Sequence, residues 1–177
     1  MDVVDQAMPD HPPAHDSKAN GSIENAVKLV QGMLRTQLSC LQSRLRCKIP
    51  CQHPLMAWMV QHVAWVLTTR NRNKEGRTPY EKLKGKAFHK RMVGIGEVCL
   101  AKLSKHAVAK AEVPKLAPRW VKGVFLGYHR ETHEYVFHTQ GKLLRTRALQ
   151  RVPASTRWNK KALEEVRLTP YTQYKKT

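Results

Sequence analysis

Acidic residues are scarce in this chain: 13 aspartates and glutamates stand against 32 lysines and arginines, and the formal net charge is +19. A polycation of this kind repels itself when compact and attracts polyanions. We therefore expect nucleic acid as the partner. An anionic membrane is a weaker alternative, since no lysine-rich amphipathic helix stands out. The few acids are also unevenly placed, because the only aspartates are Asp2, Asp5, Asp10 and Asp16.

Long apolar runs are also missing, so the sequence predicts no segment that crosses a bilayer. The N-terminus is acidic, which excludes a secretory signal or a transit peptide. We expect a soluble intracellular protein, located in the nucleus, with its four cysteines reduced. Cys40, Cys47, Cys51 and His53 lie close together but contain no C-x-x-C pair. A structural zinc site is therefore not expected.

Several enzyme signatures are absent as well. The chain has no glycine-rich phosphate loop, no G-x-S-x-G and no H-E-x-x-H. The fragment Gly94-Ile95-Gly96 lacks the rest of a dinucleotide fingerprint. No enzyme signature of these kinds is therefore present in the sequence.

Helical periodicity dominates the first half of the chain. Residues 1–19 are rich in Asp, His and Pro and are expected to form a loose leader. Apolar residues at steps of three and four predict a helix over 22–45, capped by Asn20 or Ser22. A second helix is expected from Pro54 to about residue 69, with an apolar face broad enough to be buried on two sides. A capping box at Thr78 and Glu81 predicts a third, short helix that ends at Gly85.

Short strands are expected after about residue 91. The segments 96–101, 121–128, 133–139 and 142–149 have strand character, and Gln140-Gly141 predicts a hairpin turn between the last two. Gly123 marks a bulge or a close approach. This spacing favours a small β-barrel. Residues 104–118 form a basic loop, and 153–177 are expected to hold a short helix and a basic tail.

These motifs, in this order, resemble a known family. Asn20-Gly21-x-x-Glu24 opens the long helix, an apolar helix follows, and then come Thr78-Pro79-Tyr80-Glu81 and the stretch 118–128, Pro-Arg-x-x-x-Gly-Val-Phe-Leu-Gly-Tyr. The pattern is similar to the integrase region of copia-type retrotransposon polyproteins, over roughly residues 17 to 152. The resemblance implies an α+β chain. Residues 20–90 would be the end of an RNase H-like integrase core, 91–152 an SH3-like barrel and 153–177 a basic tail.

The resemblance also implies a catalytic site. In the family an Asp, Asp, Glu triad binds two Mg²⁺ ions for in-line phosphoryl transfer. It places the third carboxylate, which is both catalytic and metal-binding, at Glu24. The first two should lie on upstream strands, and the aspartates of residues 1–19 do not match them. We therefore expect a chain that is inactive alone, with the rest of the polyprotein or a second copy as a further partner.

Two groups of basic residues are candidates for contact with DNA. The resemblance implies that Lys28 and Arg35, on the helix of Glu24, touch DNA ends; a plain surface pair between Glu24 and Lys28 is the alternative. Alternation along 142–149 places Arg145 and Arg147 on one strand face, which Arg151 would continue. Guanidinium groups in such a row can grip successive phosphates, although a solvated outer face is the alternative.

Aromatic residues could stack on bases, but in so small a barrel they are expected to form its core. The residues concerned are Trp120, Phe125, Tyr128, Tyr135 and Phe137. Trp58 and Trp65 are expected to be packing residues of the second helix, and His62 a packed histidine rather than a ligand.

The sequence thus predicts a DNA-binding fragment of a retrotransposon integrase. Three alternatives remain open: a stand-alone basic RNA- or DNA-binding module, a non-functional transposon remnant that does not fold alone, and an intact metal-dependent nuclease.

Overall fold

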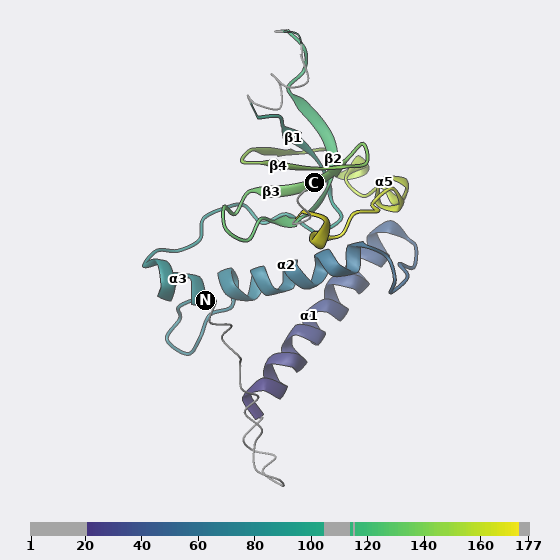
Figure 1. Ribbon diagram of the computed structural model, residues 1–177. Coiled ribbons are helices and arrows are strands. Elements are labelled where there is room, and N and C mark those ends of the chain that lie inside the picture. The colour runs from purple at the N-terminus through teal and green to yellow at the C-terminus, as the bar shows by residue number, and fades with distance from the viewer. Residues whose placement is uncertain (1–20, 105–113, 115, 174–177) are drawn as a thin grey trace, which may run out of the picture.

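The computed structural model of the chain describes residues 21–104, 114 and 116–173. Helices come first and strands follow, so the expected α+β class is confirmed (Figure 1). The predicted leader and most of the predicted basic loop lie outside the described residues. The elements are α1 (Gly21–Leu45), α2 (Leu55–Arg70), α3 (Pro79–Lys84), β1 (Val98–Lys102), β2 (Trp120–Tyr128), β3 (Tyr135–Thr139), β4 (Lys142–Thr146), β5 (Leu149–Arg151), η1 (Ala154–Thr156), α5 (Lys160–Glu164) and η2 (Pro170–Gln173).

Helix α1 is anchored only near its C-terminal end. Its buried residues are Leu41 and Leu45. Nearer its start, Ile23 and Val27 of the same predicted apolar stripe are 64% and 48% exposed. Ser22, a predicted cap, lies inside the first turn instead. The periodicity therefore predicted the helix correctly, but the neighbours that the structure describes cover only part of its stripe.

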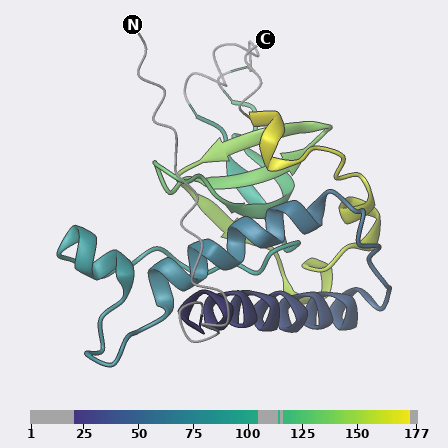
Figure 2. The ribbon, with the colours of Figure 1, turned by 60° about the horizontal axis from the view of Figure 1, so that its bottom comes forward.

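Helix α2 is buried along most of its length, as its broad apolar face predicted. Leu55, Met59 and Val63 are fully buried, and Trp58 and Trp65 are 1% and 8% exposed. Pro54 occupies the cap position rather than the first helical position. Figures 1 and 2 show α2 lying between the sheet and α1. It is therefore the element that joins the two halves of the chain.

Helix α3 has the predicted capping box. Thr78 Oγ1 accepts a hydrogen bond from the Glu81 backbone N–H at 3.1 Å, and the Thr78 N–H donates to Glu81 Oε2 at 2.7 Å. Gly85 ends the helix with a φ of 68°, a left-handed conformation that glycine adopts at no steric cost.

The five strands form one antiparallel sheet in the order β4-β3-β2-β1-β5. The turn between β3 and β4 has φ values of 47° at Gln140 and 73° at Gly141, as a two-residue hairpin requires. A Cβ atom at Gly123 would lie 3.0 Å from the His138 carbonyl oxygen, so the predicted close approach is present. The irregularity in the ladder lies elsewhere, between Phe125 and Gly127.

The expected strand 142–149 is two strands, because β4 ends at Thr146 and β5 begins at Leu149. At the break, Thr146 Oγ1 donates a hydrogen bond to the Lys102 carbonyl oxygen at 2.7 Å. The Lys102 N–H donates to the Ala148 carbonyl oxygen at 3.1 Å. These bonds bring the end of the edge strand β4 to the end of β1, so the sheet curls on itself.

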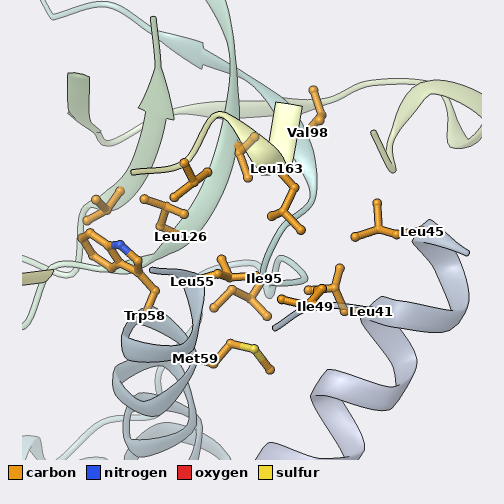
Figure 3. Packing of buried hydrophobic residues seen from close by; sticks show 13 residues of the cluster. Leu41, Leu45, Ile49, Leu55, Trp58, Met59, Ile95, Val98, Leu126 and Leu163 are labelled. Carbon is orange, nitrogen blue, oxygen red and sulfur yellow. The ribbon is translucent and has the colours of Figure 1, made fainter. Parts of the chain in front are cut away.

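Apolar side chains pack on both faces of this sheet. On one face, strand residues such as Val124 and Leu126 form a first cluster with α1, α2 and α5 (Figure 3). On the other face, Phe125 and Phe137 form a second cluster with the C-terminal half of α2, where Trp65 stacks on Tyr128 with ring centroids 3.6 Å apart. Helices therefore cover a large part of the sheet.

The predicted core role of the aromatics is confirmed for Phe125, Tyr128, Tyr135 and Phe137, which are all buried, whereas Trp120 is half-buried. The short helix predicted within 153–177 is present as α5, and this segment is part of the core. Leu163 and Val166 belong to the first cluster, and Trp58 Nε1 donates a hydrogen bond to the Leu168 carbonyl oxygen at 2.7 Å. Its apolar residues, rather than its charge, determine its place.

Candidate nucleic-acid interface

Glu24 lies on the exposed first turn of α1. Its carboxylate is 3.9 Å from Lys28 Nζ, and the two side chains are 59% and 72% exposed. This is the surface pair that the sequence offered as the alternative to a DNA contact by Lys28. Among residues 21–104 and 116–173, no group of three His, Cys, Asp or Glu side chains is placed to hold a metal ion. The aspartates at 2, 5, 10 and 16 lie outside the described residues.

Arg35 lies on the same helix and is exposed. It has no ion pair within the described part of the chain, so its guanidinium group is available to a polyanion. Lys28 makes only the long, solvent-exposed ion pair with Glu24, which contributes about 0.3 kcal/mol to stability. Both candidate residues of α1 are therefore accessible, although nothing in the described structure gathers them with the other predicted contacts.

Arg151 would continue the predicted arginine face only if the strand extended, and it does not, because β4 ends at Thr146. Arg145 pairs in register with Val136, which belongs to the first cluster, whereas Arg151 pairs with Cys99, which belongs to the second. Arg145 and Arg151 therefore lie on opposite faces of the sheet. The break after Thr146 causes the difference, because period-two alternation holds only within one continuous strand.

Each of the three arginines has a different environment. Arg145 is exposed and has no ion pair among the described residues. Arg147 is 86% exposed, and its Nε lies 3.0 Å from Glu134 Oε1. This contact lowers the pKa of the Glu134 carboxyl, so the pair stays charged. Arg151 is 28% exposed, and its Nε lies 2.9 Å from Glu97 Oε1. Only Arg145 is fully free to bind a phosphate.

Arg145 stands between two basic hollows in the surface. One has a volume of about 520 Å³ and also contains His129 and Lys142. The other has a volume of about 340 Å³ and also contains Lys102 and Arg147. We call Lys102, Lys142, Arg145 and Arg147 the β4 surface. With Glu134 as the one carboxylate in either hollow, this surface retains a clear excess of positive charge.

A second basic region, which we call the α2–α3 arm, extends from Arg70 to Lys86. It holds seven basic residues: Arg70, Arg72, Lys74, Arg77, Lys82, Lys84 and Lys86. Its two acids are occupied locally, since Glu75 lies 3.1 Å from Lys82 Nζ and Glu81 serves the cap of α3. The Lys82 contact lowers the pKa of Glu75. In both ribbon views α3 lies at the far end of α2, away from the strands (Figures 1 and 2).

None of the residues of this arm was among the contacts predicted from the sequence. The signal was present in the sequence, because seven cations and only two acids lie within 17 residues. The sequence does not show where this segment lies in space. The structure places it at the end of the molecule, with its cations exposed.

Comparisons with family models, with curated proteins and with solved structures found no significant match to this chain.

Proposed function

We propose that this protein binds nucleic acid through the phosphate backbone, without reading sequence. One observation carries the proposal: the α2–α3 arm and the β4 surface expose many cations and hold few carboxylates to neutralise them. Charges of this kind release counterions from a polyphosphate, and that release drives sequence-independent binding. Most of the aromatic side chains are buried in the core, so base stacking contributes little.

We further propose that the chain is a fragment of a retrotransposon integrase. The ordered motifs support this relation. The sheet also supports an SH3-like assignment, because β1 lies between β2 and β5 and the end of β4 returns to β1, as a small curled barrel requires. The helices before the sheet would correspond to the end of an RNase H-like core. DNA would be the partner, with the remainder of the polyprotein or a second copy supplying what this chain lacks.

Magnesium-dependent catalysis does not fit the described residues taken alone. Glu24 is exposed, faces a lysine and belongs to no cluster of metal ligands within the described chain. One carboxylate does not hold a pair of divalent ions against their hydration. In the proposed fragment Glu24 keeps its ancestral position, and Mg²⁺ would bind only where further carboxylates join it. We derive no catalytic step from this chain.

Fluorescence anisotropy with a labelled DNA duplex, titrated at several salt concentrations, tests the proposal. We expect log K to fall linearly with log[salt], with a slope of about −0.9 for each phosphate neutralised. Replacing Arg72, Lys74 and Arg77 by Ala should reduce that slope by about two to three units. The matched control replaces Lys160, Lys161 and Arg167, three exposed cations of the C-terminal segment, and should change the slope much less.

Affinity that does not change between low and high salt would contradict the proposal. Equal losses in the two triple variants would assign binding to net charge alone and remove the arm as an interface. Competition with RNA and with transposon-end DNA separates the integrase fragment from a stand-alone binding module. A nicking assay with Mg²⁺, comparing the wild type with Glu24→Gln, tests the nuclease alternative.

A further inference from the structure

A pocket with a volume of about 500 Å³ lies between α1, the side of α2 and the chain segment that leads into β1. Leu41 of α1 and Ile95 of the loop before β1 line it, and both belong to the cluster drawn in Figure 3. Its other lining residues include Arg44, Arg151, Arg157 and Trp158. Neither surface proposed above as a nucleic-acid interface lines this pocket, so it needs an explanation of its own.

One carboxylate serves two of the three arginines in this pocket. Glu97 is 2% exposed, and its Oε1 lies 2.9 Å from Arg151 Nε and 3.2 Å from Arg157 Nε. Its Oε2 accepts hydrogen bonds from the Gly94 N–H at 3.2 Å and from Arg151 at 3.3 Å. Glu97 is the only acid among the lining residues. Three guanidinium groups therefore face one negative charge, and a net positive charge remains.

The arginines are held in place but keep free donors. One terminal nitrogen of Arg151 donates to the Met92 carbonyl oxygen at 3.0 Å, and one of Arg157 donates to the Val152 carbonyl oxygen at 3.1 Å. A guanidinium group carries five N–H bonds, so each arginine has donors left. Because both side chains are about one-quarter exposed, their excess charge is only partly compensated by water. An anion in the pocket would complete that compensation.

An indole ring with an arginine over it also lines the pocket. The guanidinium group of Arg44 lies 4.6 Å from the centre of the Trp158 ring, and both residues line the pocket. Burial lowers the pKa of His62, another lining residue, to about 4, so its ring is neutral at physiological pH. The side-chain atoms Gln37 Oε1 and His62 Nδ1 have no hydrogen-bond partner in the described structure. A buried polar atom without a hydrogen-bond partner destabilises the fold unless another group supplies that partner.

Size and lining together define the ligand class. Pockets of roughly 300–1,000 Å³ suit a small organic molecule, so a bare phosphate would leave most of this one empty. Guanidinium groups suit phosphate oxygens, and an indole beside an arginine suits a flat heterocycle. We propose that this pocket binds a nucleotide phosphate, as a free nucleoside monophosphate or as the 5′-phosphorylated end of a strand. The site does not depend on the backbone contacts proposed above.

Nuclear magnetic resonance of the full chain, at a salt concentration that releases duplex DNA, tests this site. The probes are dAMP, a short single strand with a 5′-phosphate, the same strand without it, and inorganic phosphate. We expect saturable shifts of the Trp158 indole N–H signal with dAMP or with the phosphorylated strand. Arg44→Ala should weaken that binding about tenfold, which corresponds to loss of one charged hydrogen bond. Arg130→Ala removes an exposed arginine outside the pocket and should leave it unchanged.

Each outcome of this experiment supports or contradicts one part of the proposal. Binding of dAMP identifies a free nucleotide as a ligand, whereas binding of the phosphorylated strand alone identifies a strand end. If dAMP does not bind, equal affinity for the strands with and without the phosphate would overturn the site, and equal losses in the two arginine variants would overturn it in any case. Binding of inorganic phosphate as tight as that of dAMP would overturn the heterocycle contact. Loss of duplex binding at low salt, with dAMP binding retained, would count against the proposed backbone function and not against this pocket.

Discussion

Glu97 is the one carboxylate that is fully buried in the described part of the chain. No role for Glu97 could be predicted, because a single glutamate near the start of an expected strand forms no pattern. Arg151 was predicted as a DNA contact for the opposite reason, since it continued an apparent alternation. The structure pairs Glu97, the residue before β1, with Arg151 of the neighbouring strand β5. Long-range pairing of this kind leaves no local signal in a sequence.

Replacing Glu97 with Gln should destabilise the fold. The change removes the charge that Arg151 and Arg157 share and leaves two partly buried guanidinium groups without a counterion. We expect a loss of about 3 kcal/mol, at the low end of the range for broken buried pairs because the arginines are partly exposed. Urea denaturation measures it. Glu131→Gln, at an exposed residue, is the control, and equal midpoints for the two variants would refute the prediction.

His62 should make stability depend on pH. Burial lowers its pKa from 6.5 to about 4 in the folded state, so the unfolded chain binds a proton first as the pH falls. The stabilisation is complete above pH 6.5 and is lost between pH 6.5 and about 4, with a total near 3 kcal/mol. His62→Phe keeps a ring beside Trp65 and Tyr128 and should flatten the profile. His89→Gln, at an exposed residue, should not flatten it, and a steep profile in the Phe variant would contradict this assignment.

At the scale of elements, local signals were reliable. The capping box at Thr78 and Glu81 and the left-handed residues of the Gln140-Gly141 turn were predicted from a few adjacent residues, because a few adjacent residues determine them. The end of β4 at Thr146 was not predicted. It depends on the hydrogen bond from Thr146 to Lys102, a residue 44 positions away. Continuous burial of β2 also required the helices that cover the sheet, which its alternation alone does not reveal.

Removing the cap of α3 should loosen the arm. Thr78→Ala deletes the oxygen that accepts a hydrogen bond from the Glu81 N–H and should cost about 1 kcal/mol. Amide hydrogen exchange at Glu81 should accelerate accordingly. Thr36→Ala makes the same chemical change at an exposed site inside α1, where the hydroxyl bonds only to the Gly32 carbonyl oxygen, and should cost nothing. Unchanged exchange in the Thr78 variant would show that packing, not the cap, holds this helix.

For the whole molecule, the predicted boundaries after residues 90 and 152 separate segments that share one core. The first cluster contains residues of α1 and α2, of three strands and of the C-terminal segment. Sequence patterns mark where elements begin and end, but they do not say which faces meet.

No described helix is both long and apolar enough to pass through a membrane.

We therefore expect one cooperative unfolding transition. Far-ultraviolet circular dichroism, which reports the helices, and near-ultraviolet signals from the aromatic cluster should share a midpoint. Leu126→Ala, at a fully buried strand residue, should lower both signals' midpoints together and cost about 2–5 kcal/mol. Separate midpoints for the two signals would mean that helices and strands fold as independent units.

The hydrogen bond from the Trp58 indole to the Leu168 carbonyl oxygen has a practical consequence. Anyone trimming the protein to its sheet would be tempted to cut after Arg151, where the last strand ends. That cut would strip the acceptor from a tryptophan that is 1% exposed and uncover the side of the core that Leu163 and Val166 close. A shortened protein should therefore end at Pro170 or later. A protein that ends earlier should aggregate through the exposed apolar surface.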